Sequence, residues 1–293
     1  MTQLVPSAQA LGFNGLPVQA SSDDQLIDLW LYGKSAHTCR AYEADLRRFR
    51  AFTGRTLAQV TLGDLQGFAE SLTGSDATRR RTVASVKSVL TFGQKLGYLP
   101  FNIGAALQVK AQRDTLAERI LSEADVQRML ALETDPRNHA LLRFMYATAV
   151  RNSEVAGLRW RNLQPTDHGC GVANIHGKGN KTRTIRVEAG PWQEVCALRR
   201  EGSTADSPVF LSRRGGALNE SQVFRIVRAA AERAGIEATV SPHWMRHAHA
   251  SHALDRGAPV SLVQATLGHS SIATTGRYLH ARPGESSGRY LSA

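Results

Sequence analysis

The sequence is helical in pattern throughout Ser21 to about Leu107. Ser35 or Thr38 can cap a helix that runs to about Phe52, and Thr61 can cap another that begins at the next residue. Four or five short helices over this range predict a small all-α domain, which we place at residues 21–109. Residues 1–20 are rich in Gln, Ala, Ser and Pro and are typical of a flexible tail.

The rest of the chain mixes helical patterns with two short β-prone runs. These runs, at residues 171–175 and 182–187, flank the sequence Gly177-Lys178-Gly179-Asn180-Lys181, whose glycines and asparagine predict a hairpin turn. Ser122 can cap the first helix, and a last short helix is expected to carry Tyr278. We therefore predict a mainly α protein with a small β-sheet, an α+β second domain at residues 119–293 and a linker at 110–118.

The charge of the chain favours a polyanionic partner. Lys and Arg total 36 against 25 Asp and Glu, which gives a net charge of +11 over 293 residues. Nucleic acid is one such partner and an anionic membrane surface is the other, but no apolar stretch approaches the ~20 residues that span a bilayer. Three cysteines without a C-x-x-C pair are typical of a reducing compartment, so we expect a cytoplasmic protein.

Four segments of the second domain carry side chains suited to phosphodiester chemistry. Cleavage without a metal needs cations at the phosphate, a proton donor for the leaving 5′-hydroxyl, and a nucleophile whose pKa a cationic pocket lowers. The segments are Tyr146–Trp160 with Arg151 and Glu154, the turn with Lys178, the run His243-Trp244-Met245-Arg246-His247, and Leu267–Tyr278 with His269. Taken singly, the first could be a surface ion pair, the second and third solvated surface, and the fourth a packing histidine and a surface tyrosine.

In this order and local context the segments resemble the tyrosine recombinase (phage integrase) family. That family has an arginine in an A-T-G-L-R-x-S-E-like box, a lysine in a G-K-G-x-K turn, H-x-x-R-H, L-G-H, and a tyrosine about nine residues further on. The resemblance covers essentially residues 21–280, because the all-α segment also looks like the family's SAM-like core-binding domain. The short N-terminal tail favours a two-domain member similar to Xer or integron enzymes.

The resemblance implies a site-specific recombinase that cleaves and rejoins double-stranded DNA through a 3′-phosphotyrosine, in integration, excision or resolution between two sites. It further implies no metal and no other cofactor, and a homo-tetramer on paired DNA sites in the cytoplasm, at the nucleoid, with a partner recombinase as an option. The implied roles are nucleophile for Tyr278, phosphate clamp for Arg151 and Arg246, general acid for Lys178, phosphate hydrogen bonds for His243 and His269, and orientation of the site for Glu154. His243 would also assist proton movement at Tyr278.

The sequence departs from the family pattern in two places. Ala149 replaces the usual glycine, and we expect little effect because alanine is nearly as small. After Tyr278, Pro283 and Gly284 favour an extended tail over the helical tail of Xer-type members, which leaves the link between protomers open. A zinc site at His243 and His247 lacks a nearby cysteine or carboxylate, so we expect no metal.

Cationic runs in the all-α domain form a second candidate DNA-binding set. A solvated face is the ordinary alternative, but beside a cleavage domain we favour contacts to DNA phosphates. The predicted contacts are Arg40, Arg47, Arg79, Arg80, Arg81, Lys87 and, in the hairpin turn, Lys181.

Two other functions fit parts of the pattern. A type IB topoisomerase shares the cleavage chemistry but relaxes supercoils in one duplex without site dependence. A DNA-binding protein descended from a recombinase would have lost catalysis, and retention of all six catalytic residues counts against it.

Overall fold

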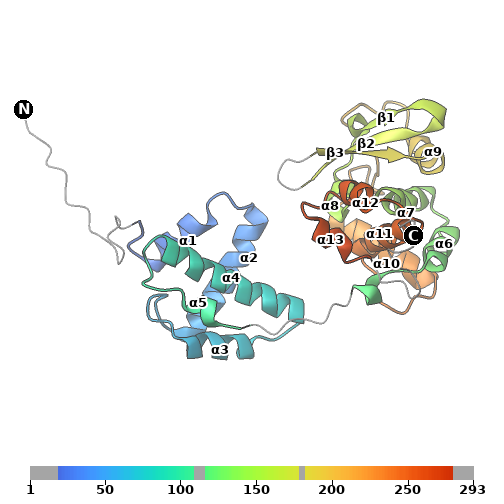
Figure 1. Cartoon of the computed structure of the whole chain (residues 1–293). Helices are drawn as coiled ribbons and strands as arrows, with labels where there is room; N and C mark the ends of the chain where they lie inside the picture. Colours follow the sequence, from blue (N-terminus) through green and yellow to red (C-terminus); the bar gives the residue numbers. More distant parts are fainter. Residues whose placement is uncertain (1–18, 109–115, 178–181, 280–293) are drawn as a thin grey trace, which may run out of the picture. The chain divides into compact units, whose positions relative to one another are not determined.

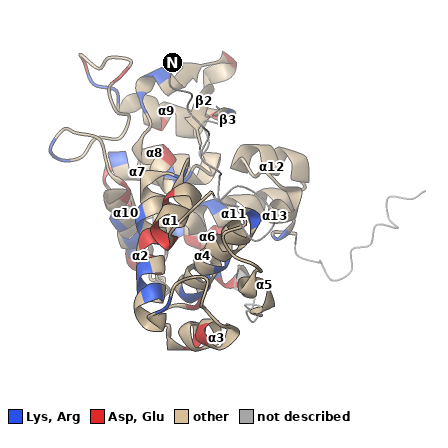
Figure 2. Cartoon of the chain, turned by 90° about the vertical axis from the view of Figure 1, so that its left-hand side faces the viewer, with Lys and Arg blue, Asp and Glu red and all other residues tan. Residues whose placement is uncertain are grey.

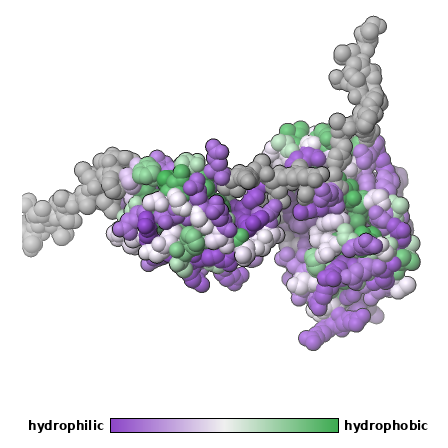
Figure 3. All heavy atoms as spheres, turned by 90° about the horizontal axis from the view of Figure 1, so that it is seen from below, coloured by the Kyte–Doolittle hydropathy of each residue, from purple (hydrophilic) through white to green (hydrophobic). Residues whose placement is uncertain are grey.

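The computed structural model describes residues 19–108, 116–177 and 182–279, and the chain divides into two compact units, Met1–Arg113 and Asp114–Ala293 (Figure 1). Most of the predicted flexible tail and linker, the centre of the hairpin turn and the C-terminal tail lie outside the described residues. Within the described ranges, no helix is long and apolar enough to cross a membrane. On the faces shown in Figure 3, hydrophobic side chains form small patches among hydrophilic ones.

Helices make up the described part of the N-terminal unit, which confirms the all-α prediction. They are α1 (Asp23–Leu31), α2 (Ala36–Thr53), α3 (Leu62–Ser71), α4 (Asp76–Lys95) and α5 (Ile103–Ala106). Ser35 and Thr61 cap α2 and α3 as predicted, because each side-chain oxygen accepts a backbone N–H of the first turn. Phe49, Phe68 and Leu90 are fully enclosed in the core between these helices.

The C-terminal unit combines helices with one sheet, as the α+β prediction requires. Its helices are α6 (Glu123–Ala131), α7 (Pro136–Thr148), α8 (Asn152–Ala156), α9 (Ala189–Ala197), α10 (Glu220–Arg233), α11 (Pro242–Asp255), α12 (Val260–Leu267) and α13 (Ile272–Gly276). Short 3-10 turns lie at Ala117–Arg119, Trp160–Asn162 and Asp167–Gly169. Ser122 caps α6 as predicted.

The sheet is antiparallel, with strand order β1-β2-β3. β2 (Gly171–His176) pairs with β3 (Thr182–Val187) over its whole length, so the predicted hairpin is confirmed. β1 (Leu163–Pro165) was not predicted, because three residues ending in proline are too few to show an alternating pattern. Trp192 of α9 covers β2 so closely that a methyl group on Gly171 would lie 2.2 Å from its ring.

Helices α7 and α11 pack against each other in the core of this unit. Leu141, Leu142 and Met145 of α7 and Met245 of α11 are inaccessible to solvent. α12 packs on α11, on α13 and on β3, as Figure 1 shows for the red and orange helices below the sheet. This packing joins the end of α7, the first turns of α11 and the end of α12, which carry the predicted catalytic side chains.

Candidate active site

Arg151 lies at the junction of α7 and α8, where its backbone and its side chain both meet Glu154. The Arg151 backbone N–H donates to Glu154 Oε2 at 2.7 Å, and Nη1 donates to Oε1 at 2.8 Å. The side chain of Glu154 is only 4% exposed, whereas that of Arg151 is 31% exposed. The three-residue spacing therefore gives the predicted contact, and Arg151 keeps an accessible edge.

Glu154 has a second arginine partner that the sequence analysis missed. Arg183 of β3 donates to both carboxylate oxygens, from Nη1 to Oε1 at 2.8 Å and from Nη2 to Oε2 at 2.7 Å. Burial alone would raise the pKa of Glu154, but hydrogen bonds from Arg183 and from the backbone of Arg151 outweigh it and lower the pKa to about 2. The carboxylate is therefore charged throughout the physiological range.

The short turn before Arg151 has a left-handed residue. Ala149 adopts φ 52° and ends α7, a conformation that costs an L-residue roughly 1–2 kcal/mol and that glycine adopts freely. The sequence interpretation considered only the size of this residue, so it missed the conformational reason for a glycine. The carbonyl of Ala149 accepts a hydrogen bond from Arg246 Nη1 at 2.6 Å.

Arg246 lies on α11 and is 4% exposed. Its second donor, Nη2, binds the carbonyl of Leu267 at the end of α12, and Arg151 Nη2 lies 3.5 Å from the same oxygen. Burial, followed by the charges of Arg151 and Arg183, lowers the pKa of Arg246 to about 10, so it stays protonated at neutral pH. Two guanidinium groups from distant segments thus converge on one carbonyl.

His269 follows the left-handed Gly268 that ends α12. Its Nδ1 lies 3.0 Å from Thr275 Oγ1, which fixes the ring beside the two arginines. Burial and the charges of Arg246 and Arg151 lower the pKa of His269 to about 4. The ring is therefore neutral at pH 7 and can serve a phosphate only as an N–H donor.

Tyr278 is 5% exposed and lies just after α13. The prediction that a helix carries it was wrong, because α13 ends at Gly276 and Tyr278 occupies the following turn. The expected lowering of its pKa was also wrong: burial raises the pKa of Tyr278, although Arg246 and Arg277 lower it. The hydroxyl is hydrogen-bonded to Nδ1 of His247 at 2.6 Å.

His247 was considered in the sequence only as a zinc ligand, and its contact with Tyr278 was not foreseen. It follows Arg246 directly and lies one turn after His243, whose ring centre is 6.2 Å from that of His247. Burial and the charge of Arg246 lower the pKa of His243 as well. The H-x-x-R-H motif was the only sequence signal that His247 belongs to the site. The motif does not specify which side chain the second histidine contacts.

A cavity of about 440 Å³ opens beside these groups. Its walls come from the end of β2, the start of β3, the start of α8 and the segment after α12. Its lining residues are Arg151, Gly177, Thr182, Arg183, Gly268, His269 and Ser270. Arginine and histidine N–H groups around such a space suit a phosphodiester. Lys178 and Lys181 lie outside the described residues.

The neutral state of His247 predicts a pH dependence of stability. Burial, followed by the charges of His243 and Arg246, lowers the pKa of His247 to about 4, whereas an unfolded histidine titrates near ~6.5. Between these pH values the unfolded chain binds more protons at this residue, so the contribution of His247 to the unfolding free energy is fully present above about pH 6.5 and is lost as the pH falls towards 4. His247→Gln has no titrating group at position 247. Its melting temperature should therefore fall less than that of the wild type between about pH 6.5 and pH 4, as measured by thermal unfolding followed by circular dichroism.

His168→Asn is the matched control for that pH series. His168 is exposed in the same unit and adopts φ 61°, a conformation that asparagine tolerates. This variant should retain the wild-type slope. Equal slopes for His247→Gln and the wild type would contradict the assignment of a buried neutral histidine.

The predicted DNA contacts of the N-terminal unit fall into two groups. Some already have partners: Arg79 pairs with Asp76, Arg81 pairs with the buried Asp45, and Lys87 donates to the carbonyl of Leu107. Others are exposed, without a hydrogen bond or ion pair to the described residues. These are Arg40 and Arg47 on α2, where Figure 2 shows several cationic residues, and Arg80 on α4.

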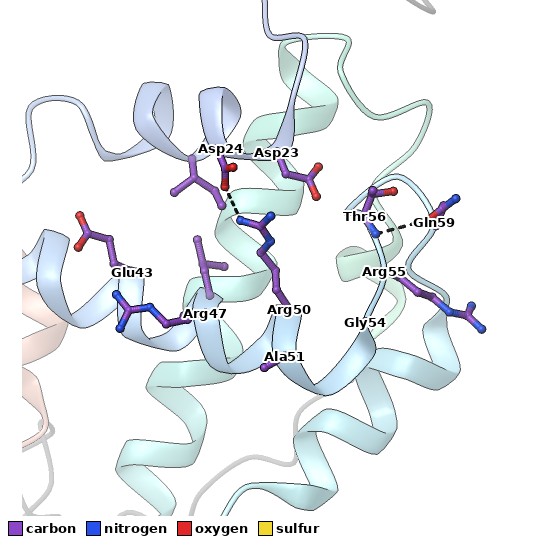
Figure 4. A pocket seen from close by; sticks show the side chains of 12 residues that line it. Asp23, Asp24, Glu43, Arg47, Arg50, Ala51, Gly54, Arg55, Thr56 and Gln59 are labelled. Carbon is purple, nitrogen blue, oxygen red and sulfur yellow. Dashed lines mark hydrogen bonds and ion pairs between the residues drawn. The ribbon is translucent and has the colours of Figure 1, made fainter.

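A cavity of about 720 Å³ lies in the N-terminal unit between α1, α2 and the segment that leads to α3 (Figure 4). Arg47 and Arg50 lie on its α2 side, and Arg50 pairs with Asp24. Asp23 accepts a backbone N–H and the hydroxyl of Tyr98. Asp24 therefore links α1 to α2, and Asp23 links α1 to the segments that follow α2 and α4. Among the described residues, no group of three or more His, Cys, Asp or Glu could hold a metal ion.

A site lined by arginine and histidine suits a DNA strand transferase, and the comparisons with known proteins give that class. Residues 119–285 match the phage integrase family, and residues 25–95 match the N-terminal SAM-like domain of phage integrases. The chain is 35% identical to tyrosine recombinase XerC of Corynebacterium efficiens, over 89% of this chain and 85% of that protein. It is 30% identical to tyrosine recombinase XerD of Bifidobacterium longum, over 86% and 89% of the two chains.

Solved structures of low identity share the fold. XerH bound to palindromic difH substrate in a post-cleavage complex has a TM-score of 0.67 at 21% identity, over 90% of this chain and 82% of that one. A lambda integrase dimer bound to a COC′ core site has a TM-score of 0.69 at 15% identity, over 90% and 96%. The chain belongs to the phage integrase family and is a tyrosine-type site-specific recombinase.

Proposed function

We propose that this recombinase cleaves a DNA strand by attack of the Tyr278 oxygen on the scissile phosphorus. As the new O–P bond makes a 3′-phosphotyrosine, the hydroxyl proton of Tyr278 passes to His243. The bond from phosphorus to the 5′-oxygen breaks, and Lys178 supplies the proton that makes this oxygen a 5′-hydroxyl. A 5′-hydroxyl from the second DNA site then gives its proton to Lys178 and attacks the phosphotyrosine, and the released Tyr278 oxygen takes its proton back from His243. The observation that carries the proposal is the convergence of Arg151 and Arg246 on the Leu267 carbonyl, beside His269.

The protonation states of the site residues support these catalytic roles. Arg246 keeps its proton at neutral pH with a pKa of about 10, so it can offset the negative charge that the phosphate develops in the transition state. His243 and His269 have lowered pKa values, and both are assigned to hydrogen bonds with the phosphate. His243 is also assigned to accept the proton of Tyr278. Tyr278 has a raised pKa and is bonded to His247, so its hydroxyl must exchange this partner for the phosphate before it attacks.

We further propose that the protein acts on double-stranded DNA in the cytoplasm, at the nucleoid, as a tetramer on two paired sites. The net charge of +11 and the exposed Arg40, Arg47 and Arg80 support contact with DNA phosphates. Similarity to both a XerC and a XerD protein supports a second recombinase as a partner. Integration, excision and resolution are the outcomes that such an exchange produces.

A plasmid assay tests exchange between sites. Purified protein is incubated with supercoiled plasmids that carry no, one or two copies of the DNA flanking its own gene, in chelator and without ATP. Recombined circles from the two-copy plasmid alone would support the proposal. Relaxation of all three plasmids without recombinants would instead indicate a topoisomerase, and binding without either product would indicate a DNA-binding protein.

The role of Lys178 gives a separate prediction that rests on its motif. Lys178→Ala should slow cleavage by roughly 10²–10⁴-fold, because the 5′-oxygen is a poor leaving group without a proton donor. Replacing that oxygen by sulfur in the substrate should restore most of the rate, since a thiolate leaves without protonation. Gel assays of both substrates measure this, and a defect that sulfur does not relieve would remove Lys178 from the general-acid role.

A further inference from the structure

Arg183 is a partly buried cation that none of the assigned roles uses. It lies on β3 with its side chain 13% exposed, and its donors point at protein atoms. Both terminal nitrogens bind Glu154, and Nε donates to the carbonyl of Thr266 at 2.8 Å. All three side-chain nitrogens of Arg183 are therefore directed at protein groups, and its side chain is less exposed than that of Arg151, 13% against 31%.

We propose that Arg183 is a positioning residue for strand cleavage, which fixes Arg151 through Glu154 and fixes the end of α12 before His269. The proposal rests on the proposed function, since it concerns the same phosphate. A planar guanidinium that meets both oxygens of a carboxylate sets the orientation of that carboxylate. Glu154 can then present Oε1 to Arg151 at 2.8 Å in one orientation.

The second contact of Arg183 is with the segment that carries His269. A methyl group added at Gly268 would lie 3.1 Å from Arg183 Cδ, so the arginine packs closely on the backbone at this left-handed residue. Together with the bond to Thr266, this contact holds the turn from which His269 projects. Arg183 therefore joins β3, α8 and the end of α12, and lines the cavity between them.

A purely structural arginine would predict a different result from a positioning arginine. A structural role affects the amount of folded, DNA-bound protein, whereas a positioning role affects the cleavage rate of protein that is folded and bound. Small misplacements of catalytic groups cost up to about 10²-fold in rate. Lysine keeps the charge and the length of Arg183 but cannot meet two carboxylate oxygens in one plane.

The test compares Arg183→Lys with Arg186→Lys. Arg186 lies on the same strand, and its Nε pairs with Glu188 at 2.9 Å, but its side chain is 58% exposed. Covalent protein–DNA adduct formation is timed at saturating protein, and melting temperature and DNA affinity are measured beside it. We expect Arg183→Lys to cleave roughly 10- to 100-fold more slowly per bound protein, with DNA affinity within about threefold, and Arg186→Lys to match the wild type.

A double variant tests the route through Glu154. If Arg183 acts through this carboxylate, Arg183→Lys combined with Glu154→Gln should cleave about as slowly as the slower single variant. Multiplied defects, or a wild-type rate per bound molecule in Arg183→Lys, would overturn the inference. If the wild-type protein formed no covalent adduct with DNA, the proposed function itself would be overturned. Failure of the proposed function and failure of the role of Arg183 are therefore distinguishable.

Discussion

Tyr278→Phe should form no covalent adduct with DNA while it binds DNA within about severalfold of the wild type. The substitution removes the only oxygen that the proposed cleavage uses as nucleophile. It otherwise deletes one hydrogen bond, to His247, and leaves the ring in its buried cluster with Val263 and Leu267. Denaturing gels measure the adduct, and mobility shifts on the same DNA measure binding.

Tyr146→Phe is the matched control for this variant. Tyr146 is a half-buried tyrosine of the same unit, and its hydroxyl also bonds Nδ1 of a histidine, His252, at 2.9 Å. Loss of a comparable hydrogen bond should leave adduct formation intact. Covalent cleavage by Tyr278→Phe at a measurable rate would assign the nucleophile to another residue.

Arg246→Lys should lose about 10²–10³-fold in cleavage rate at saturating protein. The arginine fork reaches the carbonyls of Ala149 and Leu267 and leaves further N–H groups for a phosphate, whereas a lysine offers one nitrogen. The same change leaves a buried carbonyl short of a donor, so a loss of roughly 1–3 kcal/mol in unfolding free energy should accompany it. Single-turnover cleavage and chemical denaturation measure the two effects separately.

The control for Arg246 is Arg256→Lys at the end of the same helix. Arg256 is 68% exposed and pairs with Glu123, so its replacement should change neither rate nor stability by much. If Arg246→Lys cleaved at the wild-type rate once corrected for folded protein, the phosphate clamp would require another cation.

The sequence predicted those parts of the fold that depend on local signals. Ser35, Thr61 and Ser122 each cap a helix by a bond to a residue three positions on, and such contacts can be inferred from spacing alone. The contact of Arg151 with Glu154 is of the same kind. The hairpin between β2 and β3 could also be predicted from the sequence, because glycine and asparagine mark its turn.

Long-range features could not be read in the same way. Arg183 meets Glu154 across 29 positions, and His247 meets Tyr278 across 31, so their partners depend on how α11, α13 and β3 pack. The direction of the Tyr278 pKa was misjudged because burial, which follows from that packing, outweighs the nearby arginines. The left-handed turn at Ala149 was missed because a size argument does not report backbone conformation.

Covalent trapping followed by peptide mapping tests the central claim most directly. Wild-type protein is incubated in chelator with DNA that flanks its own gene, the reaction is stopped with detergent, and the linked protein is digested and analysed by mass spectrometry. The account predicts a nucleotide joined through its 3′-phosphate to the peptide that contains Tyr278. Attachment to a different residue, attachment through a 5′-phosphate, or an adduct that forms only with a divalent metal would contradict it.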